Sequence, residues 1–425
     1  MKANALVAQS GGPSPVINAS LQGVVEACLK SPDINTVYAA HHGIEGVLLE
    51  HLIDMNRQEW SEIKRLQTSP AAAAGSCRYK LKDGYERDYQ RILDVFKAHD
   101  IHYFFYIGGN DSMDTAHKVA SLSKAQGYDL FVMGVPKTID NDLGDEARTL
   151  IDHTPGYGSC ARYWANIIKS VEEENRAMHP SECVSVLQAM GRDSGFITAA
   201  ARLGDPGREM PLLLFLPEAG HTAEAVCDLV TDGLKRWGRV IAVVSESLMA
   251  DQSHAKVDGF GHVEYGASKT TAMQTVVNLL NSKKLPVRGQ ATGQVPGILQ
   301  RSCALDASEV DREEAYTLGH RAVEYALQGV SGQMATILRV SNQPYTVRYD
   351  HVPLQKVANA ARKLPGQWIA PGGTDVTDGF INYTRPLIGR LGARFEAEDG
   401  LLRFARLKYD YVEKKLPAYT PLGFE

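Results

Sequence analysis

Residues 103–113 read YFFYIGGNDSM, and this stretch indicates a buried strand that turns at two glycines into a helix. Residues 103–107 are continuously apolar or aromatic, which is typical of a strand covered on both faces of a parallel sheet. Gly108 and Gly109 allow the backbone to turn tightly, and Ser112 is placed to cap the helix expected over residues 112–126. The stretch predicts one strand–helix unit of an α/β fold.

The same pattern recurs along much of the chain. Further continuous apolar runs occupy residues 5–9, 130–135, 184–188, 212–216 and 240–245. Amphipathic segments lie between several of them, over residues 85–100 and 222–238 among others. This alternation predicts doubly wound, mostly parallel sheets with helices on both faces. Ligands of such sheets bind beyond the carboxyl ends of the strands, so the loops there are the places to look for chemistry.

Length and composition limit the class of protein. A chain of 425 residues suits two or three domains, and a net charge of −5 without a strongly basic half makes nucleic acid an unexpected partner. No apolar run approaches the length of a membrane span, and the apolar start is too short for a signal peptide, so we expect a cytoplasmic protein without a membrane partner. The six cysteines form no C-x-x-C pair, which predicts reduced thiols rather than zinc ligands.

Glycines and polar residues follow five of the predicted strands. The loops are SGGPSP (10–15), GGNDS (108–112), PKTIDND (136–142), AMGRDSG (189–195) and PEAG (217–220). Gly11 and Gly12 stand before a helix, where exposed amides suit an anion. In the second loop, Gly109 allows close backbone approach and Asp111 is a candidate Mg²⁺ ligand. For each of these first two loops taken alone, an ordinary turn is at least as good an explanation.

The loop 136–142 combines a cation with paired carboxylates. Lys137 and Thr138 precede Asp140 and Asp142, which stand two residues apart. A carboxylate beside a substrate hydroxyl can accept its proton, and a lysine ammonium suits a phosphate. The two carboxylates would repel each other unless a cation or a hydroxyl lies between them. The alternative is a solvated acidic turn.

Single charged residues complete the list of candidates. Arg192 can bind a phosphate with a planar fork of donors, and Glu218 can accept hydrogen bonds from sugar hydroxyls. Arg78 and Arg301 are similar isolated cations. Each of these residues, taken alone, is more often an ordinary surface residue.

Taken together and in order, these loops resemble the phosphofructokinase family. The resemblance rests on SGG, GSCRY, GGNDS, PKTIDND, MGR, PE and LQRS, and it covers roughly residues 1–340. It implies a two-domain α/β subunit that phosphorylates the 1-hydroxyl of fructose 6-phosphate. One domain, for the phosphoryl donor, would hold residues 1–150 and about 295–365. The other, for fructose 6-phosphate, would hold residues 151–294, with a C-terminal extension of open role over residues 366–425.

The resemblance also implies roles for individual residues. The phosphoryl donor would bind at Gly12 and the GGNDS turn, with Arg78 near the transferring group. Asp140 would accept the proton of the 1-hydroxyl, with Thr138 and Asp142 beside it. The sugar phosphate would meet the following residues: Met190, Gly191, Arg192, Glu218 and Arg301.

Two positions favour the pyrophosphate-dependent branch of this family. ATP-using relatives have GGDGS and PGTIDND, so Asp111 and Lys137 both stand where those relatives have glycine. A carboxylate at 111 would repel the α-phosphate of a nucleotide, whereas a lysine at 137 would stabilise charge on diphosphate. The resemblance implies Mg²⁺ as the cofactor, bridging the two phosphates.

Other positions depart from the family pattern. Asn110 replaces the metal-associated aspartate, so a metal would depend on phosphate oxygens, water and Asp111. Cys183 and Ile298 stand where the family often has an arginine and a histidine. Arg288 is a candidate second cation for the 6-phosphate. Because the family shares some cations between subunits, a homodimer or homotetramer is expected. Two alternatives stay open: an ATP-dependent kinase, and a catalytically silent regulatory subunit that binds sugar phosphate.

Overall fold

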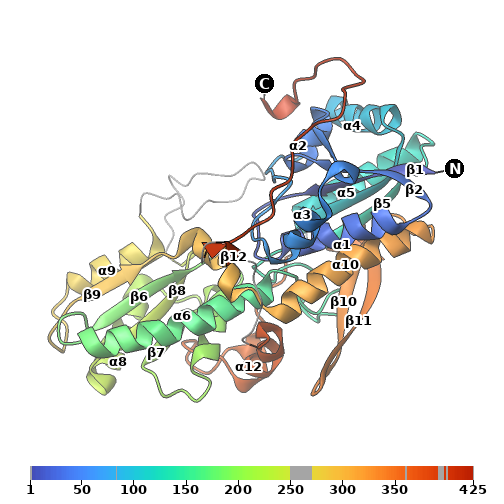
Figure 1. Ribbon diagram of the computed structural model, residues 1–425. Helices are drawn as coiled ribbons and strands as arrows, with labels where there is room; N and C mark the ends of the chain where they lie inside the picture. The colour runs from blue at the N-terminus through green and yellow to red at the C-terminus, as the bar shows by residue number, and fades with distance from the viewer. Residues whose placement is uncertain are drawn as a thin grey trace.

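The structure is a computed structural model, and it describes residues 2–82, 84–248, 270–358, 361–390, 397–398 and 401–424. Its helices and strands form two lobes, each built around one main sheet (Figure 1). A seven-stranded sheet has the order β11-β10-β5-β4-β1-β2-β3, and a four-stranded sheet has the order β7-β8-β6-β9. This arrangement confirms the predicted fold class.

All six predicted strands are present, and the structure adds others. The larger sheet consists of β1 (Ala3–Gln9), β2 (Ile34–Ala40), β3 (Leu52–Asp54), β4 (Ile101–Gly108), β5 (Phe131–Pro136), β10 (Gln333–Asn342) and β11 (Tyr345–Pro353). The smaller sheet consists of β6 (Val184–Ala189), β7 (Leu212–Phe215), β8 (Val240–Ser245) and β9 (Ala291–Gln294). Only β3 and β11 run antiparallel to their neighbours in these two sheets, each at an edge.

Helices cover both faces of each sheet. They are α1 (Ile17–Lys30), α2 (Gly43–Leu48), α3 (Trp60–Arg65), α4 (Glu86–Ala98), α5 (Asn110–Ala125), α6 (Tyr157–Met178), α7 (Phe196–Ala200), α8 (Ala223–Trp237), α9 (Ala272–Asn281), α10 (Glu309–Leu327), α11 (Leu354–Val357) and α12 (Asp378–Thr384). Along β4, Phe105 packs in the core with α1 and α10, while Phe104 packs on the opposite face with α2, α4 and α5. Two buried faces explain why the strand sequence is continuously apolar.

One local prediction is wrong. Ser112 does not cap α5, because the helix begins at Asn110 with Gly109 at the cap position. The hydroxyl of Ser112 instead donates to that of Ser10, at 2.9 Å. This contact joins the turn after β4 to the turn after β1.

The C-terminal segment packs on both lobes. Trp368, Phe380 and Tyr383 belong to the core that includes α6 and α7, whereas Leu407 belongs to the core of the larger sheet. Figure 1 shows the final segment running along the larger lobe to an end near α4. Within the described residues no helix is long and apolar enough to cross a bilayer. All six cysteines are free thiols.

Candidate active site

The loops after β1, β4 and β5 meet at the carboxyl edge of the larger sheet. The ammonium of Lys137 donates to the carbonyl of Gly12 at 2.6 Å, and its backbone N–H donates to the carbonyl of Gly108 at 2.9 Å. From the smaller sheet, the loop after β6 brings Nε of Arg192 to 3.9 Å from Oδ2 of Asp140. The strand ends of both sheets therefore face one site, as the fold predicts.

A group of cations surrounds Lys137. Its side chain is buried, and burial together with the charges of Arg301, Arg192 and Arg78 lowers its pKa to about 7, against the opposing effect of Asp140. Burial and the neighbouring Arg78 likewise lower the pKa of Arg301. So much positive charge in a buried place favours a multiply charged anion such as a phosphate or a diphosphate.

Gly12 leaves room for one of these cations. A Cβ atom at this position would lie 2.4 Å from a guanidinium nitrogen of Arg301 and 3.8 Å from one of Arg78. A larger residue would therefore push the Arg301 side chain out of its place. Glycine is therefore required at position 12 because of the side chain of Arg301, which is 289 residues away in the sequence.

The paired carboxylates lie beside the cations. The backbone N–H of Asp140 donates to the hydroxyl of Thr138 at 3.1 Å, which shapes the turn. Burial and the charge of Asp140 raise the pKa of Asp142 to about 6, while Arg192 lowers it. The charge of Asp140 therefore disfavours the charged form of Asp142, as expected for two neighbouring carboxylates.

Glu246 orients the loop that carries Arg192. Its Oε1 atom accepts hydrogen bonds from the backbone N–H groups of Gly191 and Arg192, at 3.2 and 3.0 Å. Gly191 and Arg192 have positive φ angles of 124° and 52°. Burial and the charge of Asp140 raise the pKa of Glu246 to about 7. Two carboxylate–amide contacts thus hold a backbone turn that non-glycine residues rarely adopt.

Sequence reasoning missed Glu246 and Gln300. Glu246 comes directly after the apolar run 240–245, so the strand-end rule applied to the other loops would have found it. Gln300 is buried, and its Oε1 accepts from the N–H of Met190 at 3.1 Å and from Nε1 of Trp164 at 2.9 Å. Gln300 lies in the LQRS stretch that contributes to the resemblance, but only Arg301 of that stretch was given a role.

Glu218 has one carboxylate oxygen that is hydrogen-bonded and one that has no partner among the described residues. Its Oε1 accepts from the N–H groups of Gly195 and Leu364, both at 2.8 Å. Its Oε2 is buried and has no hydrogen-bond partner among the described residues. Burial raises the pKa of this carboxyl group. A buried acceptor without a partner is costly, which fits an oxygen that receives a hydroxyl from a ligand.

The first turn of α5 brings together the candidate metal ligands. Asp111 forms an ion pair with Lys80, whose Nζ lies 2.9 Å from its Oδ1, and its N–H donates to Oδ1 of Asn110 at 3.0 Å. Sequence reasoning did not find Lys80. Three or more metal-ligating side chains gather nowhere in the described part of the chain. This donor set fits a Mg²⁺ ion held mostly by phosphate oxygens and water, with one or two protein oxygens.

Arg288 lies away from these groups. It is exposed and precedes β9, whose first residue pairs with Val184 at the amino-terminal end of β6. The Met190–Arg192 loop follows the opposite end of β6, and β6 is six residues long. The next residue, Gly289, lies beside Cys183 just before β6, since a Cβ at this position would be 3.1 Å from the N atom of Cys183. Within one subunit, Arg288 is therefore not brought to the site.

Replacing Glu246 with alanine should raise the KM for the sugar phosphate that the sequence resemblance implies as the substrate. The Gly191–Arg192 turn loses the acceptor that holds two N–H groups, so Arg192 is presented less often in its binding position. We expect about a 10-fold increase in KM, measured in steady-state assays at neutral pH. Glu246→Gln keeps an oxygen acceptor and serves as the matched control. An alanine variant with unchanged kinetics would contradict this role.

Comparisons of this chain with known proteins agree on one family. The family model described as Phosphofructokinase matches residues 4–326. A pyrophosphate–fructose 6-phosphate 1-phosphotransferase of Halomonas elongata is 40% identical, over 98% of this chain and 99% of its own length. The enzyme with the same name from Xanthomonas campestris is 39% identical, over 98% of this chain and 99% of its own.

A solved structure shows the same likeness in three dimensions. The pyrophosphate-dependent phosphofructokinase from Nitrosospira multiformis superposes with a TM-score of 0.88 and 38% identity. The superposition covers 98% of this chain and all of that one. These full-length matches extend through the C-terminal segment, beyond the part that the family model covers.

Proposed function

This chain belongs to the phosphofructokinase family, and we propose that it is a pyrophosphate-dependent 6-phosphofructokinase. The reaction transfers a phosphoryl group reversibly from diphosphate to the 1-hydroxyl of fructose 6-phosphate, and it yields fructose 1,6-bisphosphate and phosphate. The observation that carries the proposal is the buried ammonium of Lys137, which lies among three arginines in front of Asp140. This arrangement supplies positive charge for a small, highly charged donor.

We assign the donor site to the loops of the larger sheet. Gly11, Gly12 and Gly109 supply backbone close to the ligand, and Lys137, Arg78 and Ser112 supply donors. The following groups are therefore proposed to bind diphosphate: Gly11, Gly12, Arg78, Gly109, Asp111, Ser112 and Lys137. In the first turn of α5, the carboxylate of Asp111 forms an ion pair with Lys80 at 2.9 Å. A side-chain ion pair at this place supports a donor without a nucleoside.

The sugar phosphate is assigned to the loops of the smaller sheet and to Arg301. Arg192 and Arg301 would bind the phosphate, and Glu218 would accept a hydroxyl with its buried Oε2. Thr138, Met190 and Gly191 would complete this site. Arg288, which lies outside it, would serve the neighbouring subunit of a homodimer or homotetramer. We propose that this oligomer works in the cytoplasm.

Asp140 is proposed to act as the general base. The oxygen of the 1-hydroxyl bonds to phosphorus as its proton moves to the Asp140 carboxylate, and the bond from phosphorus to the bridging oxygen of diphosphate breaks. Lys137 and Arg192 stabilise the negative charge on the transferred group and on the leaving phosphate. Bound Mg²⁺ would be held by Asp111 and Asn110 and would neutralise charge on diphosphate.

A donor assay tests this function. Purified protein with fructose 6-phosphate and Mg²⁺ should form fructose 1,6-bisphosphate with diphosphate and show at least about 100-fold lower kcat/KM with ATP, because two sites disfavour a nucleotide. The double variant Asp111→Gly, Lys137→Gly should lose diphosphate use. A preference of the wild type for ATP, with an unaffected double variant, would identify an ATP-dependent kinase instead. Binding of fructose 6-phosphate without turnover would indicate a silent subunit.

A further inference from the structure

Arg362 is one of the most deeply buried charged side chains of the protein, with 2% of its surface exposed. Its Nε donates to the carbonyl of Asn141 at 2.7 Å, and Nη2 donates to Oδ1 of the same residue at 2.7 Å. Nη1 donates to the carbonyl of Ile151 at 2.7 Å, and Nη2 also donates to that of Asp152 at 3.0 Å. One guanidinium therefore joins the loop 136–142 to residues 151–152.

The residue that Arg362 holds stands between the two site carboxylates. Asn141 follows Asp140, precedes Asp142, and has a φ of 57°, which few residues adopt without support. Its Oδ1 also accepts from the N–H of Thr154 at 3.0 Å. The backbone N–H of Arg362 itself donates to the carbonyl of Asp142 at 2.6 Å. The direction of both carboxylates thus depends on a turn that Arg362 fixes.

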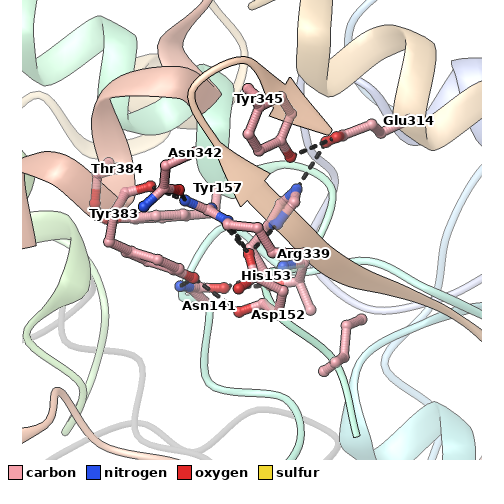
Figure 2. Close-up of polar contacts among 12 residues, drawn as sticks. Asn141, Asp152, His153, Tyr157, Glu314, Arg339, Asn342, Tyr345, Tyr383 and Thr384 are labelled. Carbon is pink, nitrogen blue, oxygen red and sulfur yellow. Dashed lines mark hydrogen bonds and ion pairs between the residues drawn. The ribbon is translucent and has the colours of Figure 1, made fainter. Parts of the chain in front are cut away.

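Residues from the C-terminal segment hold the same turn from another side. Figure 2 shows Tyr383 beside Asn141 and Asp152. The amide of Asn141 donates to the hydroxyl of Tyr383 at 3.0 Å, and this hydroxyl donates to the carbonyl of Asp152 at 2.8 Å. Arg339 donates to the carbonyl of Tyr383 at 2.7 Å and to the carboxylate of Asp152 at 3.0 Å. The turn is therefore part of a rigid polar network, as precise catalysis requires.

The chain around Arg362 reaches the sugar side of the site as well. Two residues later, the N–H of Leu364 donates to Oε1 of Glu218 at 2.8 Å. This contact leaves Oε2 as the oxygen of Glu218 that has no hydrogen-bond partner among the described residues. Residues 362–364 therefore contact both the loop 136–142, which follows a strand of the larger sheet, and Glu218, which follows a strand of the smaller sheet.

We propose that Arg362 is a positioning residue for phosphoryl transfer: it fixes the Asn141 turn so that Asp140 meets the acceptor hydroxyl held near Glu218. The proposal rests on the function proposed above. Arg362 does not touch the reacting atoms. It acts through Asn141, and its geometry explains why arginine is needed, since three nitrogens bond to four acceptors, whereas a lysine ammonium cannot span them.

The matched control is Arg202, which is equally buried with 2% exposure. Its guanidinium donates to Asp375 at 2.7 Å, to Asp205 at 2.7 Å and to the carbonyl of Leu212 at 3.0 Å. None of these contacts involves the loop 136–142. Arg202→Lys therefore reports the cost of disturbing a buried arginine network without disturbing the site.

The experiment compares Arg362→Lys with Arg202→Lys in the full-length protein. We expect kcat with diphosphate to fall about 10- to 100-fold in R362K, because a small misplacement of reacting groups has effects of this size. The KM for diphosphate should stay within about threefold in R362K, and R202K should keep kcat within about twofold per folded molecule. Near-UV circular dichroism and thermal melts give the folded fraction.

The pH profile of kcat is the second readout. Burial and Asp140 raise the pKa of Asp142, whereas Arg192 and Arg362 lower it. Removing the charge in Arg362→Met should raise the pKa of Asp142 further, and Asp142 stands beside the general base Asp140. If protonation of Asp142 disturbs the Asp140 loop, the acidic limb of the profile moves to higher pH in R362M and stays in place in R202K. If R362M does not fold, R362K carries the kinetic comparison alone.

Several results would overturn the inference. They are a kcat of folded R362K within about twofold of the wild type, an equal loss in R202K, or a loss that only follows the folded fraction. Failure of the proposed function looks different, because the wild type itself would then show no turnover with diphosphate. The comparison would in that case be made with the donor that the wild type uses, and the same outcomes would decide it.

Discussion

Asp140→Ala should lower kcat by about 10²- to 10⁴-fold, the usual effect of losing a positioned general base. The 1-hydroxyl then has no acceptor for its proton, although the phosphate contacts of Arg192 and Arg301 remain. Asp140→Ser should behave in the same way. Binding of fructose 6-phosphate, measured by isothermal titration calorimetry, should change less than about fivefold, because binding and chemistry depend on different groups.

Asp193→Ala provides the control for Asp140. Asp193 is an exposed carboxylate directly after Arg192, so its loss removes a similar charge from a neighbouring strand-end loop. We expect its kcat to stay within about twofold of the wild type. If D140A turned over at nearly the wild-type rate, Asp140 would not be the base, and Asp142 would become the candidate.

Lys137→Met should lower kcat/KM for diphosphate by about 10²- to 10³-fold, the size seen when one preorganised electrostatic donor is lost. The KM for fructose 6-phosphate should change far less. The melting temperature at pH 7 should not fall, because the ammonium of Lys137 is buried among arginines that disfavour its charge. A variant that loses diphosphate use without losing stability separates a functional lysine from a structural one.

The charge of Lys137 also predicts a pH dependence. Burial and the neighbouring arginines lower its pKa to about 7, so the side chain is charged below that pH and neutral above it. In the wild type, kcat/KM for diphosphate should therefore decrease as pH rises through about 7. The K137M profile should lack this decrease, and comparing the two profiles cancels the ionisation of diphosphate itself.

Lys118→Met is the control for Lys137. Lys118 lies on α5 in the same lobe and pairs with Asp114 at 3.1 Å, outside the site loops. Its kinetics should match the wild type at every pH. Equal losses of diphosphate use and sugar binding in K137M would show that the residue supports the whole site rather than the donor.

The strands and strand-end loops could be predicted because their signal is local. Each of the six runs is mostly apolar over its five or six residues. The structure buries both faces of these strands. In contrast, β2 (INTVYAA) and β10 (QMATILRVSN) mix polar and apolar residues, so their place in the sheet depends on partners elsewhere.

The parts of the site that were missed arise from contacts between distant segments. Arg362 meets Asn141 across 221 positions, and Lys80 meets Asp111 across α4 and β4, so neither pair has a spacing that a motif could reveal. Lys137, Asp140 and Arg192 were predicted because they follow strands, and parallel strands gather their carboxyl ends. The roles of these residues remain predictions that the variants above address.

The partnerless oxygen of Glu218 has a consequence for sugar discrimination. A buried acceptor with no partner among the described residues gains most from a ligand that carries a hydroxyl at the matching carbon. A deoxy analogue without that hydroxyl would leave the Glu218 oxygen buried without a hydrogen bond in the complex. The affinity for this analogue should therefore drop more than the loss of a solvent-exposed hydrogen bond would cause. A series of deoxy sugars would thus reveal which carbon faces Glu218.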